Sequence, residues 1–317
     1  MLKAALIPTF SPEHISRFTD IEGVNVKWNA LEDAEIILGN PTDAQIAACP
    51  KLKWIQLTNA GVNNYVSRPA LRERGIVLTC ASGAFGQSIS ECVLAMVLSL
   101  YKHLNLFRDN QRECLWQDAG RQMSPCGKKL LVLGAGDIGQ SVARIMSPFG
   151  VRAVGVRTHA AAGDELFEKY ITLDEVDDYL PGADIVVCSL PETEKTIGFM
   201  NAERIALLNQ NAILVNVGRG SLIDCAALAD ALNRGTLYGA ALDVTSPEPL
   251  PAEHPLWKCK NAIIMPHATG GSFGHLTATE EKIFEIAREN LKRYLKGEAL
   301  MNVVNFSSGY RDGNNRI

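Results

Sequence analysis

The chain has 317 residues, a formal net charge of −4 and a hydrophobic content of 47%. This length is too great for one small core and suits two domains of roughly 150 residues each. The slightly acidic charge gives no electrostatic reason to expect nucleic acid or an anionic membrane as a partner, and we predict neither.

Short apolar runs rich in Val, Ile and Leu alternate with helix-period segments through most of the chain, which is typical of a parallel sheet covered by helices. The first series of predicted strands lies at residues 4–8, 24–28, 34–39, 53–58 and 76–80. A second series lies at 129–134, 152–156, 183–190, 212–217, 238–244 and 262–267. Because each series can build its own sheet, we predict an α/β protein with two Rossmann-like domains.

Two long segments between and after these series have helical patterns. Residues 88–116 are apolar nearly all round in their first half, so this helix is expected to be buried between the domains or against a second subunit. Residues 276–298 have the apolar stripe of a helix packed on a surface. If this last helix returns to the first domain, that domain is discontinuous.

A glycine-rich turn follows the predicted strand at 129–134. Gly134, Gly136 and Gly139 fit the G-x-G-x-x-G pattern, with Asp137 and Ile138 inside it, and a helix and a second strand come next. In that setting the glycines permit a tight turn, a close backbone approach to a pyrophosphate and close helix packing. The segment therefore predicts a dinucleotide site.

The second strand of this unit ends at Arg157, where an acid that binds the ribose 2′-hydroxyl of NAD is common. An arginine can instead bind a 2′-phosphate and stack on adenine, and Thr158 adds a hydroxyl beside it. We predict a preference for NADP(H). NAD(H) remains the alternative, because no second Lys or Arg follows to complete a phosphate clamp.

Three side chains with catalytic chemistry follow strands of the second series. Arg219, Glu248 and His267 come after the strands at 212–217, 238–244 and 262–267, whose carboxyl ends border one crevice in a parallel sheet. An arginine can bind a substrate carboxylate, and a histidine held by a carboxylate can exchange a proton with a keto oxygen. The set predicts the reduction of a 2-oxoacid.

The eight cysteines are scattered, with no C-x-x-C pair and no histidine at ligand spacing. This pattern favours reduced thiols in a cytoplasmic protein and predicts no metal site.

Six motifs in their order and spacing resemble the D-isomer-specific 2-hydroxyacid dehydrogenase family, which includes glyoxylate and hydroxypyruvate reductases. They lie at residues 58–64, 133–139, 190–198, 216–224, 241–251 and 265–272. The resemblance implies that Arg219, Glu248 and His267 are catalytic and that backbone amides of Ala60, Gly61 and Val62, together with Arg219, bind the substrate carboxylate. It also places at the cofactor Ser189, Leu190, Pro191, Thr196, Val217 and Asp243, and in the cleft Ser88.

The resemblance further implies a substrate domain of residues 1–97 and 282–317, a cofactor domain of residues 98–281, and a homodimer. The chain departs from the family pattern at Asn63, at Arg157 and at the bulky Phe85 near the expected substrate mouth. These departures affect the expected identity of the substrate more than the expected reaction.

The leading hypothesis is an NADP(H)-preferring 2-oxoacid reductase acting on glyoxylate or hydroxypyruvate. The first alternative is an NAD-linked D-2-hydroxyacid dehydrogenase of another specificity. The second is a nucleotide-sensing corepressor on the same scaffold, against which the absence of long extensions and of a basic cluster argues.

Overall fold

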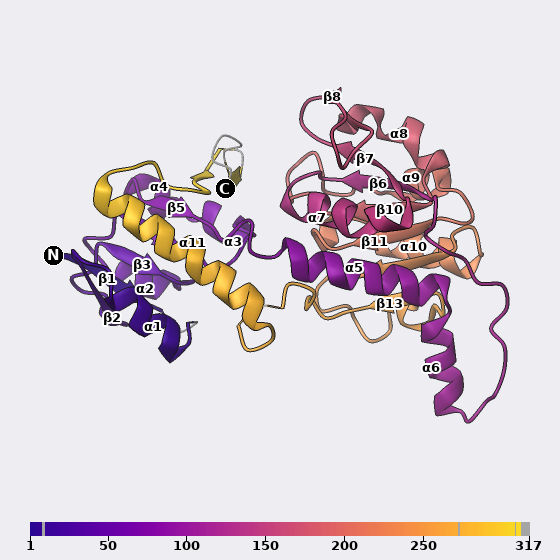
Figure 1. Ribbon diagram of the computed structural model, residues 1–317, viewed down its shortest axis with the longest axis horizontal. Coiled ribbons are helices and arrows are strands. Elements are labelled where there is room, and N and C mark those ends of the chain that lie inside the picture. Colours follow the sequence, from indigo (N-terminus) through magenta and orange to yellow (C-terminus); the bar gives the residue numbers. More distant parts are fainter. Residues whose placement is uncertain (8–9, 272, 308, 312–317) are drawn as a thin grey trace. The chain divides into compact units, whose positions relative to one another are not determined.

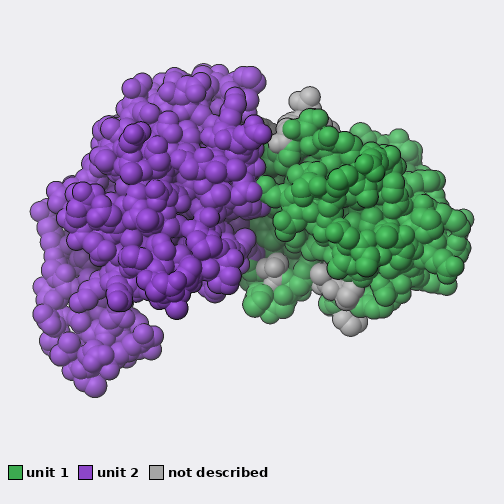
Figure 2. Space-filling model, turned by 180° about the vertical axis from the view of Figure 1, so that it is seen from behind, with its two compact units in different colours: residues 1–85, 271–317 green, residues 86–270 purple. Residues whose placement is uncertain are grey.

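The computed structural model describes residues 1–7, 10–271, 273–307 and 309–311. The chain divides into two compact units, residues 1–85 with 271–317 and residues 86–270, which are coloured separately in Figure 2. The predicted boundaries at 97/98 and 281/282 fall inside helices α5 (Gly86–Tyr101) and α11 (Thr277–Lys296), whereas the units divide just before these helices begin.

The first unit contains a five-stranded parallel sheet in the order β2-β1-β3-β4-β5. Its strands are β1 (Leu2–Leu6), β2 (Val24–Trp28), β3 (Ile36–Leu38), β4 (Trp54–Gln56) and β5 (Val77–Thr79). Its helices are α1 (Pro12–Thr19), α2 (Asp43–Ala47), α3 (Asn63–Val66), α4 (Pro69–Glu73) and α11, and a small hairpin of β14 (Val304–Asn305) and β15 (Tyr310–Arg311) follows. All five predicted strands are present: β2 has the predicted bounds, and the other four are shortened or displaced by a few residues.

Helix α11 returns to this first sheet, so the first unit is discontinuous, as predicted. In Figure 1 it is the long yellow helix of this unit. Asn290 on α11 donates to Gln56 Oε1 at 2.7 Å, and the Tyr294 ring stacks on Trp54 with centroids 5.1 Å apart. A fully buried amide pair and an aromatic stack therefore fix the last helix on β4.

The second unit contains an eight-stranded sheet in the order β13-β12-β11-β10-β6-β7-β9-β8, parallel except for the pair β8/β9. Its strands are β6 (Lys129–Leu133), β7 (Arg152–Val156), β8 (Ala161–Ala162), β9 (Lys169–Ile171), β10 (Ile185–Cys188), β11 (Ile213–Asn216), β12 (Gly239–Leu242) and β13 (Ala262–Ile264). Its α-helices are α5, α6 (Leu104–Arg112), α7 (Asp137–Met146), α8 (Val176–Tyr179), α9 (Ala202–Leu207) and α10 (Cys225–Asn233). Single 3₁₀ turns lie at Ser147–Phe149, Leu173–Glu175, Leu180–Gly182, Gly220–Leu222 and Pro255–Lys258.

The six strands predicted for this unit are all present, and the two-domain α/β fold is confirmed. The chain runs outward from β6 through β7 and β9, then crosses back to β10 on the other side of β6. Ligands of open α/β sheets bind beside the carboxyl ends of the strands where this direction reverses. The topology therefore makes the edge around β6 and β10 the binding edge.

The long helix predicted at 88–116 is two helices in the structure. Helix α5 ends at Tyr101, His103 has a left-handed φ of 56°, and α6 begins at Leu104. The buried side of α5 packs on α7, β12 and β13 of its own unit, a partner that the sequence interpretation did not include. Figure 1 shows α6 and the segment after it projecting from the rest of this unit.

Candidate active site in the second unit

Six of the predicted site residues of the second unit lie in one row along the carboxyl edge of its sheet. From β13 to β7, the residues after the strands are His267, Asp243, Val217, Ser189, Gly134 and Arg157. Backbone hydrogen bonds continue the ladder beyond the strand ends, with His267 N–Asp243 O at 2.8 Å, Asp243 N–Asn216 O at 2.9 Å, Val217 N–Cys188 O at 3.0 Å and Ser189 N–Leu133 O at 2.8 Å. The row is therefore part of the rigid sheet rather than of loose loops.

His267 and Glu248 are in contact at one end of this row. Nδ1 of His267 lies 2.7 Å from Oε1 of Glu248, and about half of each side chain is exposed. The imidazole can therefore hydrogen-bond the carboxylate through Nδ1 while Nε2 remains on the far side of the ring for a substrate.

The backbone of His267 has a left-handed φ of 54°, which is uncommon for a residue with a side chain. Asp243, only 3% exposed, holds this turn, because its Oδ1 accepts from the N–H groups of Ala268 at 2.7 Å and Thr269 at 3.1 Å. Its Oδ2 accepts from the Thr269 hydroxyl at 2.5 Å. Sequence reasoning placed Asp243 at the cofactor and missed this bracing of the histidine turn.

Ser88, predicted in the cleft, braces the same turn from helix α5. Its hydroxyl donates to the carbonyl oxygen of Thr269 at 2.7 Å, and its side chain is buried. The residue thus links α5 to the segment that follows His267.

Arg219 stands in a turn that is fixed by the buried Asn216. The Asn216 amide donates to Arg219 O at 2.9 Å and accepts from Gly218 N at 3.1 Å, and Arg219 Nη1 donates to Gly218 O at 2.7 Å. The next residue, Gly220, lies so close to Thr245 that an added Cβ would come within 1.8 Å of the Thr245 carbonyl oxygen. The turn of Arg219 is therefore packed directly on the loop that leads to Glu248.

The glycine turn has the close packing that its sequence predicts. A Cβ on Gly139 would lie 2.3 Å from the carbonyl oxygen of Gly134, and a Cβ on Gly134, where φ is 105°, would lie 2.9 Å from the Ser189 backbone. Gly136 is the N-cap of α7 and has no side chain that could accept from the first N–H groups of the helix. A phosphate can therefore approach these N–H groups and the positive end of the helix dipole, so the turn fits a dinucleotide.

The predicted cofactor segment 189–196 is folded on itself beside this turn. Ser189 donates to Gly134 O at 2.8 Å, and the buried Thr196 donates to Pro191 O at 2.7 Å and accepts from Thr193 N at 2.8 Å. Leu190 and Pro191 remain partly exposed, whereas the hydroxyl of Thr196 holds the loop together from within. Asp137 and Ile138 in the first turn of α7 are also partly exposed.

Arg157 lies at the other end of the row, and Thr158 beside it is exposed. The Arg157 side chain donates from Nε to Ala135 O at 3.3 Å and from Nη2 to the Tyr170 hydroxyl at 3.0 Å. Tyr170 is a residue that sequence reasoning missed.

Ala60, Gly61 and Val62 lie in the first unit, in the loop between β4 and α3. Asn40 secures the start of this loop, since its Oδ1 accepts from Thr58 N at 3.1 Å and its Nδ2 donates to Thr58 Oγ1 at 2.7 Å. These predicted substrate residues are thus also at the carboxyl edge of a parallel sheet, that of the first unit.

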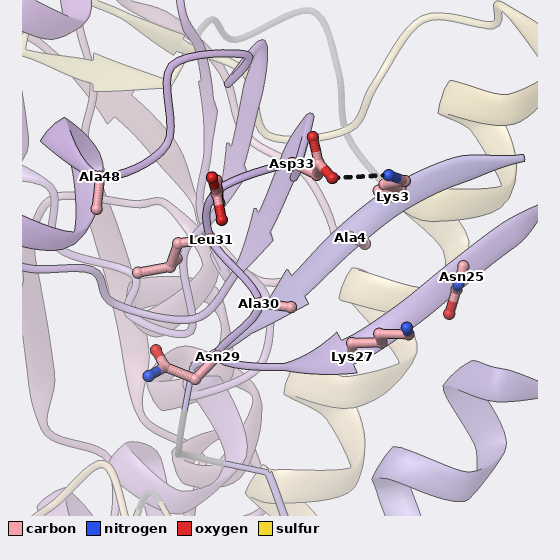
Figure 3. A pocket seen from close by; sticks show the side chains of 10 residues that line it. Lys3, Ala4, Asn25, Lys27, Asn29, Ala30, Leu31, Asp33 and Ala48 are labelled. Atoms are coloured by element: carbon pink, nitrogen blue, oxygen red, sulfur yellow. Dashed lines mark hydrogen bonds and ion pairs between the residues drawn. The ribbon is translucent and has the colours of Figure 1, made fainter.

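A hollow of about 470 Å³ lies elsewhere in the first unit, beside β1 and β2 (Figure 3). Among its charged groups, Asp33 accepts from Lys3 at 2.9 Å and also from the nearby Lys51 at 2.6 Å. The hollow contains none of the predicted site residues.

Three further features of the described residues concern metal ligands, membrane-spanning helices and thiols. No group of three His, Cys, Asp or Glu side chains suited to a metal ion occurs among them, and none of their helices is long and apolar enough to cross a membrane. All eight cysteines have free thiols, and burial raises the pKa of Cys188 in β10 well above its ordinary value.

Comparisons with known proteins agree with this arrangement. Residues 94–269 match the family model described as "D-isomer specific 2-hydroxyacid dehydrogenase, NAD binding domain". A glyoxylate reductase of Korarchaeum cryptofilum is 31% identical over 85% of this chain and 81% of its own.

Solved structures of similar proteins share the whole fold. A D-isomer specific 2-hydroxyacid dehydrogenase family protein of Aeromonas salmonicida is 30% identical, with a TM-score of 0.84 over 96% of this chain and 100% of its own. A D-isomer specific 2-hydroxyacid dehydrogenase of Xanthobacter autotrophicus, solved in complex with NADPH and MES, is 28% identical, with a TM-score of 0.83 over 98% and 100% of the two chains. The chain belongs to the D-isomer specific 2-hydroxyacid dehydrogenase family of NAD(P)-binding oxidoreductases that act on CH–OH donors.

Proposed function

We propose that this protein reduces a small 2-oxoacid, glyoxylate or hydroxypyruvate, to the 2-hydroxyacid with NADPH. The observation that carries the proposal is the row of residues along one sheet edge. At one end stands a histidine–carboxylate pair, in the middle the glycine turn and the N-terminus of α7, and at the other end an arginine.

The row suits an extended dinucleotide. Gly134, Gly136 and Gly139 with the start of α7 would hold the pyrophosphate, and Asp137 and Ile138 lie in that first turn. The nicotinamide end would face the residues that follow the next strands, namely Ser189, Leu190, Pro191, Thr196, Val217 and Asp243. The reduced nicotinamide supplies the hydride when it is bound.

His267 would supply the proton. In its protonated form Nε2 donates to the keto oxygen while a hydride adds to the carbonyl carbon, so one C–H bond and one O–H bond form and the imidazole is left neutral. Glu248, whose Oε1 lies 2.7 Å from Nδ1, would hold the ring in this orientation. In the oxidative direction the neutral His267 would accept the proton.

Arg219 and the loop of Ala60, Gly61 and Val62 would bind the substrate carboxylate. A guanidinium presents paired N–H donors to a carboxylate, and free backbone amides of a loop supply further donors. Asn216 fixes the turn of Arg219 through two hydrogen bonds to the backbone, so the backbone that carries the Arg219 side chain is held in place.

The preference for NADPH rests on Arg157 at the ribose end, with Thr158 next to it. The related Xanthobacter protein was solved with NADPH, which agrees with this part of the proposal. NAD(H) is expected to bind more weakly, because it lacks the 2′-phosphate that would pair with the guanidinium of Arg157.

A homodimer in the cytoplasm completes the proposal. The large apolar side chains of Leu104, Leu115 and Trp116 are exposed on α6 and the segment after it, as a subunit contact requires. The scattered reduced thiols suit the cytoplasm.

The test is a set of initial rates of reduced-nicotinamide oxidation, with NADPH and NADH in parallel, against glyoxylate, hydroxypyruvate, pyruvate and bulkier branched or aromatic 2-oxoacids. We expect the highest kcat/KM with NADPH and one of the first two acids. A preference for NADH, or for a bulky acid, refutes the corresponding half of the proposal. Tight NADPH binding without turnover of any acid would instead favour a nucleotide-sensing protein.

A further inference from the structure

The guanidinium of Arg157 is held by a neighbouring strand and a hairpin. Strand β9 pairs with β7 in a register that places Tyr170 opposite Gly155. Arg157 comes two residues after Gly155 and so points to the same side of the sheet. Its guanidinium carbon lies 3.6 Å from the centroid of the Tyr170 ring.

Tyr170 has little freedom to move. Its side chain is 3% exposed, and a Cβ on Gly155 would lie 3.0 Å from the Tyr170 ring, so the ring fills the space that this glycine leaves. The ring also packs on Phe167, with centroids 5.1 Å apart. The arginine therefore rests on a fixed aromatic surface.

The Tyr170 hydroxyl connects Arg157 to the carboxylate of Asp164 through hydrogen bonds. It accepts from Arg157 Nη2 at 3.0 Å and donates to Oδ2 of Asp164. Asp164 is itself held, because its Oδ1 accepts from Leu166 N at 2.9 Å and Phe167 N at 3.0 Å. The Tyr170 hydrogen bond is the largest of the causes that lower the pKa of Asp164. The result is a series of hydrogen bonds that runs from Arg157 through the Tyr170 hydroxyl to Asp164.

The turn that carries Asp164 is part of the β8–β9 hairpin. Ala161 pairs with Tyr170, and Asp164 N donates to Phe167 O at 2.8 Å. A Cβ on Gly163 would lie 2.2 Å from Glu168 O, so the hairpin closes tightly. The hairpin thus brings Asp164 next to Tyr170, which follows it by six residues in the chain.

This arrangement determines which part of Arg157 a ligand can use. Tyr170 covers one face of the guanidinium, and Nε and Nη2 already have protein acceptors. Within the described part of the chain, Nη1 has no acceptor. A long arginine side chain normally loses rotamer freedom when it binds a ligand, and fixing it beforehand removes part of that entropy cost.

We propose that Tyr170 and Asp164 are positioning residues that hold Arg157 for the 2′-phosphate of NADPH and so set the cofactor selectivity. The inference rests on the proposed function, because it assumes that Arg157 meets the adenosine end of the cofactor. Neither residue is expected to touch the reacting atoms.

The test measures binding of adenosine 2′,5′-bisphosphate and of 5′-AMP by calorimetry, so it needs no turnover. We expect the wild-type protein to bind the bisphosphate more tightly. Tyr170→Phe keeps the ring but removes both hydrogen bonds, and we expect it to weaken bisphosphate binding about threefold to tenfold and leave 5′-AMP unchanged. Asp164→Asn is expected to act in the same direction by a smaller factor.

A double-mutant cycle and a matched control complete the experiment. In an Arg157→Ala background, Tyr170→Phe is expected to have no further effect. Tyr179→Phe removes a hydroxyl that bonds another cation, Lys169, and should leave both affinities unchanged. The proposal is overturned by an unchanged bisphosphate affinity in Tyr170→Phe, by additive effects in the double variant, or by tighter binding in Asp164→Asn.

Parallel rates with NADPH separate this inference from the proposed function. Turnover of a 2-oxoacid together with an unaffected bisphosphate affinity in Tyr170→Phe refutes only the positioning role. Lost bisphosphate selectivity in Tyr170→Phe, in a protein that turns over no 2-oxoacid, supports the positioning role and refutes the reductase. A wild-type protein that does not distinguish the bisphosphate from 5′-AMP overturns both the positioning role and the NADPH preference.

Discussion

The carboxylate of Asp243 shows how much of the site depends on one buried residue. It accepts three hydrogen bonds from Ala268 and Thr269 and so holds the turn of His267, whose φ of 54° needs support from its surroundings. The sequence indicated that Asp243 follows a strand, but the three donors belong to a loop of another strand. Only the tertiary register brings them together.

Asp243→Asn tests this bracing. An amide oxygen can accept from the two backbone N–H groups, but its NH₂ group faces the Thr269 hydroxyl in place of an acceptor. We expect kcat for 2-oxoacid reduction to fall by about tenfold, the value of roughly one hydrogen bond to a charged group, with KM for NADPH less affected. Thr269→Val should lower kcat in the same direction, and unchanged kcat in both variants would contradict the bracing role.

Asp33 provides a pH prediction outside the site. Hydrogen bonds from Lys51 and Lys3 lower the pKa of this carboxyl from 3.8 to about 2. Since the pKa is lowered by folding, the ion pairs stabilise the folded protein above pH 3.8, and this contribution disappears as the pH falls through about 2.

Carboxyl NMR titration measures this value directly. We expect Lys51→Met to raise the pKa of Asp33, whereas Lys27→Met, which changes a lysine that lines the same hollow as Asp33 (Figure 3), should leave it unchanged. An Asp33 that titrates at its ordinary value in the wild-type protein would show that these pairs do not form in solution.

At the scale of elements, the strands were the most predictable part of the chain. The runs at 24–28 and 152–156 coincide with β2 and β7, because each is rich in valine and begins within two residues of a glycine that ends the preceding segment. Strands β8 and β9, with two and three residues, were missed because they are too short to show the alternation of apolar and polar residues that marks a strand. Missing this hairpin also meant missing Tyr170 and Asp164 as partners of Arg157.

The prediction of one long helix at 88–116 was wrong, and the local sequence contains no signal for the break between α5 and α6. No Gly or Pro interrupts "LSLYKHLNLF", and the break comes from the left-handed backbone of His103. His103 also lies 3.0 Å, through Nε2, from the carbonyl oxygen of Arg121. That partner lies 18 residues away and has no signal in the pattern of the helix.

Gly220→Ala tests the packing between the Arg219 turn and the Glu248 loop. The added methyl group would meet the Thr245 carbonyl, so we expect about 1–3 kcal/mol of destabilisation, as for overpacked cores, and a lower kcat. Urea unfolding provides the free energy of unfolding. Gly182→Ala is the control, because its nearest neighbour is Lys129 Nζ at 4.0 Å. Equal unfolding free energies in the two variants would contradict the close packing.

At the scale of the whole molecule, the proposed dimer makes a separate prediction. Trp116 is fully exposed, with Leu115 beside it, on the segment after α6. We expect sedimentation equilibrium to give the mass of two chains, and Trp116→Ser with Leu115→Ser to shift it towards one chain. Trp28→Ser, which changes an exposed tryptophan of the first unit, should retain the dimer. A wild-type monomer at micromolar concentration would refute this assembly.

The central claim is that the sheet edge of the second unit is a reductase site with His267 as its proton donor. The most direct measurement compares NADPH-dependent reduction of glyoxylate or hydroxypyruvate by the wild-type protein and by His267→Ala, with NADPH affinity measured on the same samples. We predict an unchanged NADPH dissociation constant and a loss of about 10²–10⁴-fold in kcat, the contribution of a general acid. A His267→Ala protein that binds NADPH normally and retains turnover within twofold of the wild type would contradict the account.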